Sequence, residues 1–131
     1  MRARRRAIPK RLATSRALPP DVSRASLVLS VVQTDNTFTC QPNGDWVGKC
    51  LFCGTKVAVS ATGSTIATIE HIFPLTGGGD LTDPHNLGLA CRRCNGEKGA
   101  RHDRHVGKGG RADEVIAAML ARRADRWRDA P

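Results

Sequence analysis

The apolar positions along the chain predict two helices, one on each side of a β-rich centre. Between residues 25 and 32, apolar side chains recur at helical spacing behind Asp21 as a candidate cap, although the β-branched residues there also allow a strand. A second helix is predicted over about residues 111–128, with acidic residues in its first turn and arginines towards its end. Its apolar stripe comprises Ile116, Met119, Leu120, Ala124 and Trp127.

The centre of the chain is typical of short strands. Residues 56–60 and 65–69 are rich in strand-forming types, and the Ala-Thr-Gly that separates them predicts a hairpin or a short loop. A short apolar run opens at Asn86, and a further helix is predicted from Cys91, on which Cys91, Asn95 and Lys98 fall near one face. These elements predict one small α+β domain over residues 21–131. Residues 1–20 end in a pair of prolines and are interpreted as an arm outside the fold.

The charge distribution indicates an anionic partner. The formal net charge is +9, with eight Arg and Lys against one Asp in residues 1–24 and eleven against six acids in residues 90–131. A basic surface is also consistent with an ordinary solvated face, and the Arg-rich arm is also typical of a transit peptide. No apolar run approaches the roughly 20 residues of a membrane span. With only 4% aromatic residues, a base-stacking platform is disfavoured, so double-stranded DNA is the predicted partner.

The arginines near the C-terminus, Arg122, Arg123, Arg126 and Arg128, allow two interpretations. They form either a solvated face of the last helix or a second set of phosphate contacts. Closer to the centre, Lys98 and Arg101 are the first candidates for phosphate contacts, followed by His102, Arg92 and Arg93.

Four cysteines form two Cys-x-x-Cys pairs, Cys50 with Cys53 and Cys91 with Cys94. Four thiolates are the ligand set of a closed, tetrahedral structural zinc site, and 37 residues (54–90) lie between the two pairs. Two disulfides or buried thiols are the alternatives. Cys40 is left over, as an ordinary free cysteine or an alternative ligand.

The segment between and beyond these pairs carries an ordered set of motifs. Glu70-His71 is followed by Ile-Phe-Pro, then by a run of glycines, by Asn86-Leu87, and by Cys-Arg-Arg-Cys-Asn-Gly-Glu-Lys ending at Lys98. Together with the first Cys-x-x-Cys, this order resembles the HNH endonucleases, also called ββα-metal or His-Me finger nucleases, over about residues 50–101. The resemblance implies a small ββα-metal finger held together by structural zinc, with flanking helices.

The resemblance also implies a role for each matching residue. His71 corresponds to the general base that activates water, Glu70 and Asn95 to the ligands of a catalytic cation, and Asn86 to the asparagine that orients the loop bearing the histidine. The chain departs from the commonest pattern twice, with Glu70 where Asp is frequent and Asn95 where His is frequent. Oxygen ligands alone favour Mg²⁺ or Mn²⁺ over softer metals.

These observations predict a metal-dependent DNA endonuclease that is cytoplasmic and is encoded by a bacterium or a phage, and they leave the oligomeric state open. Two plainer interpretations stand beside the individual roles: His71 as a half-buried histidine bonded to Glu70, and Asn86 as a cap or turn residue after Asp83-Pro84. The alternative function is a catalytically inactive, zinc-finger-like DNA-binding module. A zinc-knuckle protein-interaction domain is disfavoured by the basic flanks.

Overall fold

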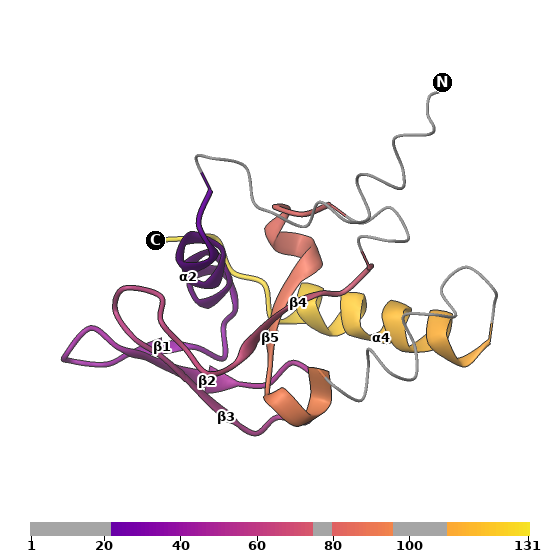
Figure 1. Ribbon diagram of the computed structural model, residues 1–131, viewed down its shortest axis with the longest axis horizontal. Coiled ribbons are helices and arrows are strands. Elements are labelled where there is room, and N and C mark those ends of the chain that lie inside the picture. The colour runs from indigo at the N-terminus through magenta and orange to yellow at the C-terminus, as the bar shows by residue number, and fades with distance from the viewer. Residues whose placement is uncertain (1–21, 75–79, 96–109) are drawn as a thin grey trace.

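The computed structural model describes residues 22–74, 80–95 and 110–131, and it confirms the α+β class (Figure 1). The predicted arm, residues 1–20, lies outside this described part. The elements are α2 (Arg24–Thr34), β1 (Thr39–Cys40), β2 (Trp46–Lys49), β3 (Lys56–Val59), β4 (Thr68–His71), the 3-10 helix η2 (Pro84–Asn86), β5 (Leu87–Ala90) and α4 (Arg111–Asp125). Residues 92–95 are also helical. Among the described helices, none has the length and apolar character to cross a membrane.

The first segment, for which helix and strand were both open, is helix α2. It begins after the N-cap Ser23, whose hydroxyl accepts a hydrogen bond from the backbone N–H of Ser26 (3.0 Å), while the Ser23 N–H donates to the Ser26 hydroxyl (3.2 Å). Asp21, the predicted cap, lies outside the described residues. Val28, Val31 and Val32 are fully buried on one face of α2, so core packing outweighs the strand preference of their β-branched side chains.

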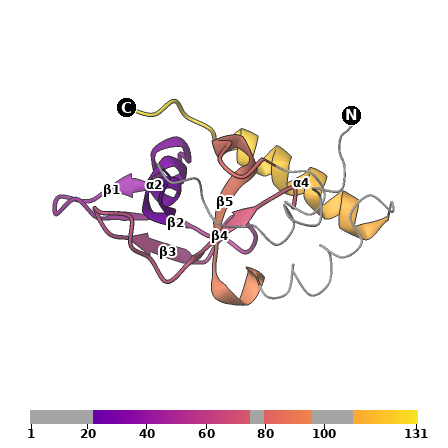
Figure 2. The same ribbon diagram turned by 45° about the horizontal axis from the view of Figure 1, so that its top comes forward.

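The strands form two antiparallel sheets, and this arrangement decides between the hairpin and the loop that were both open after residue 60. Strand order is β1-β2-β3 in one sheet and β4-β5 in the other, so β3 and β4 are joined by a loop and do not form a hairpin with each other. A turn at Gly63 (φ 90°) closes this loop, with the Ser60 N–H donating to Ser64 O at 2.9 Å. The true partner of β4 is β5, whose four residues are all buried. Figure 2 shows the β4–β5 pair between the three-stranded sheet and α4.

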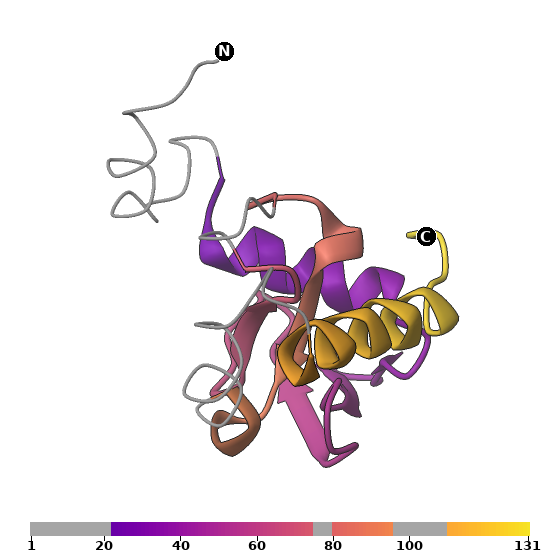
Figure 3. The same ribbon diagram turned by 90° about the vertical axis from the view of Figure 1, so that its right-hand side faces the viewer.

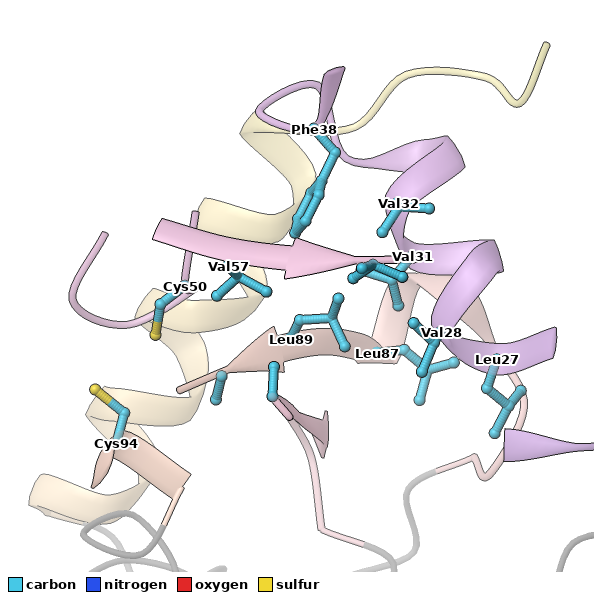
Figure 4. Packing of buried hydrophobic residues seen from close by; sticks show 13 residues of the cluster. Leu27, Val28, Val31, Val32, Phe38, Cys50, Val57, Leu87, Leu89 and Cys94 are labelled. Atoms are coloured by element: carbon cyan, nitrogen blue, oxygen red, sulfur yellow. The ribbon is translucent and has the colours of Figure 1, made fainter. Parts of the chain in front are cut away.

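Two apolar clusters surround the β4–β5 pair. The larger joins α2 to both sheets through residues that include Val28, Val57 and Leu89, and Figure 4 shows Cys50 and Cys94 at its edge. The smaller joins α4 to the segment after β4 and to the first cysteine pair through Leu51, Ile72, Ile116 and Met119. The β4–β5 pair is therefore fixed from both sides by helices far apart in the sequence.

Helix α4 buries only part of the apolar stripe that the sequence predicts. Ile116 and Met119 are buried as predicted, whereas Leu120 is 36% exposed and Ala124 is also exposed. Arg123 takes the inward position and is 1% exposed. Its guanidinium donates to Leu87 O (2.7 Å), Thr34 O (3.0 Å) and the Thr34 hydroxyl (2.6 Å), which satisfies its buried N–H groups. Burial lowers the pKa of Arg123, and the nearby Asp35 carboxylate opposes that lowering.

The ends of α2 and α4 converge (Figure 3), where Asp35 and Trp127 form an isolated antiparallel bridge. The Arg128 N–H donates to Thr34 O (2.9 Å), and the Arg128 guanidinium donates to Val32 O (2.7 Å) and Phe38 O (2.8 Å). Arg123 and Arg128 thus bind main-chain carbonyls, which neither interpretation of the C-terminal arginines anticipated.

Candidate active site and metal centre

The two Cys-x-x-Cys pairs meet in space. The sulfur atoms of Cys50, Cys53, Cys91 and Cys94 all lie within 4.8 Å of one another. The Cys53 and Cys91 sulfurs are 3.8 Å apart, and a tetrahedral site with zinc–sulfur bonds of about 2.3 Å requires sulfur separations of about 3.8 Å. All four cysteines are free, so the disulfide alternative is wrong, and Cys40 is exposed and is not part of the group. The four thiols are positioned to hold a metal ion, and their number and spacing suit structural zinc.

The main chain around Cys50 is arranged for a thiolate. The N–H groups of Phe52 and Cys91 both donate to the Cys50 sulfur at 3.4 Å. Gly54, at φ 77°, allows the tight turn in which its own N–H donates to Cys50 O (3.1 Å). Figure 4 shows the sulfurs of Cys50 and Cys94 turned towards one another.

The pKa values of two of these thiols are shifted in opposite directions. Hydrogen bonds from Thr55, first from its hydroxyl and then from its main chain, lower the pKa of the exposed Cys53 to about 6. Burial, followed by hydrogen bonds with Cys91 and Cys53, raises the pKa of Cys94. A thiolate therefore forms readily at Cys53, whereas Cys94 needs a nearby positive charge to ionise, which a divalent cation supplies.

Glu70 and His71 are the last two residues of β4, opposite Gly88 and Leu87 of β5. Both remain in the β-ladder, so regular alternation places their side chains on opposite faces of the hairpin. Glu70 is 5% exposed, and His71 is half-buried. The structure therefore brings the two residues to the same strand end without bringing their side chains to the same face.

One ring nitrogen of His71 is assigned by its partner. His71 Nε2 lies 3.1 Å from Leu81 O. Because a carbonyl oxygen only accepts hydrogen bonds, Nε2 carries the proton, and the basic lone pair of the neutral ring is on Nδ1.

Asn86 joins the two ends of the segment that follows β4. Its Oδ1 accepts from the Phe73 N–H (2.8 Å), and its Nδ2 donates to Phe73 O (3.1 Å) and Asp80 O (3.4 Å). The cap of η2 is Asp83, whose carboxylate accepts from the His85 N–H at 3.0 Å. The buried Asn86 side chain thus holds Phe73 close to the residue that precedes Leu81.

Asn95 lies five residues beyond the end of β5, in the helical turn that follows Cys91, and it is half-buried. Its N–H donates to Cys91 O (3.1 Å). Arg92 and Arg93 are exposed in the same turn. The remaining predicted DNA-contact residues, Lys98, Arg101 and His102, lie outside the described residues.

Sequence reasoning named Arg122 and Arg126 only as a solvated face or as phosphate contacts, and it missed their place beside the metal centre. Arg122 Nη1 donates to Leu51 O (2.8 Å) and Phe52 O (2.9 Å), and Arg126 Nη1 donates to Lys49 O (3.3 Å) and Cys50 O (3.4 Å). The signal in the sequence is their separation by four residues, which places both on one face of α4. Nothing in that spacing indicates what the face would contact.

The comparison with protein families agrees with the motif order. Residues 50–109 match the family model described as HNH endonuclease. No curated protein matches the chain significantly. The matched segment contains both cysteine pairs, the Glu70-His71 strand end and Asn86. Over residues 50–109, this chain is therefore similar to the HNH endonuclease family.

Proposed function

We propose that the protein is a metal-dependent endonuclease that hydrolyses phosphodiester bonds in double-stranded DNA. The family match supports a nuclease and a nucleic acid substrate. The observation that carries the proposal further is the His71 Nε2 contact with Leu81 O, because it leaves the Nδ1 lone pair as the proton acceptor. A neutral imidazole is the side chain most often used for that task.

His71 takes a proton from the attacking water at Nδ1, and Asn86 acts as its positioning residue. Asn86 binds Asp80 O, and Asp80 is the neighbour of Leu81, whose carbonyl orients the imidazole ring. The ring orientation therefore depends on a buried amide that makes three hydrogen bonds to main-chain groups of two residues.

Glu70 and Asn95 would hold the catalytic cation. A carboxylate and an amide carbonyl are hard oxygen donors, which fit Mg²⁺ or Mn²⁺. When bound, such a cation supplies charge stabilisation for the phosphate and for the leaving oxygen. Glu70 and His71 lie on opposite faces of β4. A substitution of Glu70 is therefore expected to test cation binding, and a substitution of His71 to test proton transfer.

The four cysteines would hold Zn²⁺ as a structural ion, since four protein thiolates leave no coordination position for water. The basic flanks support DNA as the substrate, because eight Arg and Lys lie in residues 1–24 and eleven in residues 90–131. The proposed setting is the interior of a bacterial or phage-infected cell.

A second candidate function is a zinc-stabilised DNA-binding module that does not cleave. The burial of Glu70, which is 5% exposed, favours it, because a catalytic cation must also reach water and substrate. This module would keep the metal centre and the basic flanks and would need no general base.

Incubation of purified protein with supercoiled plasmid and Mg²⁺, Mn²⁺ or EDTA separates the two functions. Cleavage with a cation and none with EDTA is expected. His71→Ala should reduce the rate by roughly 10² to 10⁴, the usual contribution of general-base catalysis, with DNA affinity and zinc content unchanged. His85→Ala, at an exposed histidine elsewhere, is the matched control. A zinc-loaded His71→Ala protein that cuts as fast as wild type would contradict the mechanism.

A further inference from the structure

Four consecutive carbonyls of the first cysteine knuckle, from Lys49 to Phe52, accept hydrogen bonds from Arg122 of α4 and from Arg126, the C-cap of that helix. Arg126 Nη1 donates to Lys49 O and Cys50 O, and Arg122 Nη1 donates to Leu51 O and Phe52 O, at distances of 2.8–3.4 Å. The two arginines are separated by one helical turn, so one face of α4 lies along the knuckle. We refer to Arg122 and Arg126 as the arginine clamp.

The N–H groups of the same peptides also make hydrogen bonds, within the knuckle and to β5. Cys50 N–H donates to Thr55 O (2.7 Å), and Leu51 N–H donates to Leu89 O (2.9 Å) of β5. Phe52 N–H donates to the Cys50 sulfur (3.4 Å). In a trans peptide the C=O and N–H point in opposite directions, so fixing the Leu51 carbonyl also aims the Phe52 N–H at the sulfur.

The clamp also places positive charge beside a site that becomes negative. Four thiolates around a divalent cation carry a net charge of −2. A guanidinium that polarises the Leu51–Phe52 peptide strengthens the hydrogen bond which that peptide donates to the Cys50 thiolate. Groups in this position around a metal site commonly control its affinity by orienting the ligands that bind the ion.

We propose that Arg122 and Arg126 are positioning residues of the metal centre, which hold the first cysteine knuckle in its metal-binding geometry and slow the loss of the ion. The inference rests on the proposed assignment of structural zinc, but it does not depend on DNA cleavage. It gives α4 a role in supporting the metal centre, although this helix lies beyond the segment that matches the family model.

The test measures how fast zinc leaves the loaded, full-length protein to an excess of a coloured chelator, well below the melting temperature. Arg122→Met keeps an unbranched apolar side chain but removes the charge and both hydrogen bonds. Release is expected to be about 10- to 100-fold faster, the usual effect of losing such a supporting partner. Arg122→Lys should restore slow release, because one nitrogen of Arg122 makes both bonds. Arg111→Met, at the exposed first residue of α4, is the matched control and should release zinc at the wild-type rate.

Two further measurements keep the inference falsifiable. In Co²⁺-loaded protein, Arg122→Met should shift the sulfur-to-metal charge-transfer band, which a general loss of stability would not do. If Arg122→Met fails to fold, Arg122→Gln replaces it and should release zinc faster than Arg122→Lys. Wild-type release from the Met or Gln variant, or equal acceleration in Arg111→Met, would overturn the clamp. A protein that binds no Zn²⁺ at these cysteines would overturn it too, whereas failure to cut DNA would leave it standing.

Discussion

At the scale of single residues, the arrangement around His71 depends on the side chains of Asn86 and Asp80. His71 donates to Leu81 O, and Asn86 fixes the preceding residue, Asp80, through its carbonyl. The Asp80 carboxylate stabilises the same turn by accepting from the N–H groups of Thr82 (2.8 Å) and Asp83 (3.2 Å). The hydrogen bond from the Thr82 main chain is the chief cause that lowers the pKa of Asp80. The imidazole ring of His71 is therefore oriented by main-chain geometry.

The first prediction concerns Asn86→Asp, which keeps the side-chain shape and the oxygen that faces the Phe73 N–H. It removes the Nδ2 donor to Phe73 O and Asp80 O, and the lost bonds should lower the free energy of unfolding by about 1–3 kcal/mol. Plasmid cleavage should fall further than this loss of stability explains, because the Leu81 carbonyl is no longer held. Asn43→Asp, at an exposed position in the β1–β2 turn, is the control for denaturation and cleavage. Wild-type cleavage by Asn86→Asp would show that Asn86 does not position the base.

The second prediction concerns the pH at which Cys53 becomes a thiolate in the metal-free protein. Its pKa is lowered to about 6 chiefly by the Thr55 hydroxyl, so alkylation of Cys53 should slow as the pH falls through about 6. In Thr55→Val the pKa should rise towards its ordinary value of 9.0, and the same slowing should begin at higher pH. Mass spectrometry of the alkylated peptides measures this, with Thr62→Val as the control. Identical profiles for Thr55→Val and wild type would contradict the assigned cause.

At the scale of elements, the helices and strands could be predicted from local sequence patterns, whereas the pairing of the strands could not. The helical spacing of residues 25–32 and the strand character of residues 56–60 and 65–69 were visible because each depends on neighbours in the sequence, and the structure has strands at 56–59 and 68–71. The pairing of β4 with β5 was not, since a run of β-forming residues does not specify its partner. The set of four cysteines positioned for a metal ion was predictable from spacing, because few other arrangements use two Cys-x-x-Cys pairs.

Helix α4 shows why an apolar stripe can mislead. Arg123 lies in the core because carbonyls from α2 and β5 meet there and need donors, and no helical periodicity reveals those acceptors. Leu120, one turn earlier, is 36% exposed as a result.

A third prediction follows for this helix. Arg123→Met should lower the free energy of unfolding by at least about 3 kcal/mol, because Leu87 O and Thr34 O lose a charged donor in a buried place. Leu120→Ala should cost clearly less, since that side chain already meets solvent. Urea denaturation of the zinc-loaded proteins gives both values. A larger loss for Leu120→Ala would mean that α4 presents its predicted stripe to the core after all.

At the scale of the whole molecule, the formal charge of +9 overstates what the described surface offers to DNA. Arg122, Arg123, Arg126 and Arg128 all donate to main-chain carbonyls, so part of each guanidinium is already engaged within the protein. The phosphate contacts of the proposed nuclease must then come largely from other basic residues. Seven Arg and Lys lie in residues 1–17.

The fourth prediction is that deletion of residues 1–17 weakens DNA binding regardless of sequence. The slope of log affinity against log salt should become shallower by about 0.9 for each duplex phosphate that the shortened protein no longer neutralises. Lys56→Gln, which removes one exposed charge from β3, is the control and should change the slope by no more than the value for a single phosphate. Fluorescence anisotropy across a salt series gives the slopes. If the deletion leaves both affinity and slope unchanged, the arm does not bind DNA.

The junction between the ends of α2 and α4 has a consequence for how the protein is made. Residues 123–128 supply donors to Thr34, Val32, Phe38 and Leu87, and Asp35 pairs with Trp127. A ribosome translates the N-terminal elements first, but they cannot close their core until this late segment has left the exit tunnel. The His71 strand end is therefore expected to stay unassembled on nascent chains until residues 123–128 have emerged, so that the proposed cutting site forms only after the last turn of α4 is available.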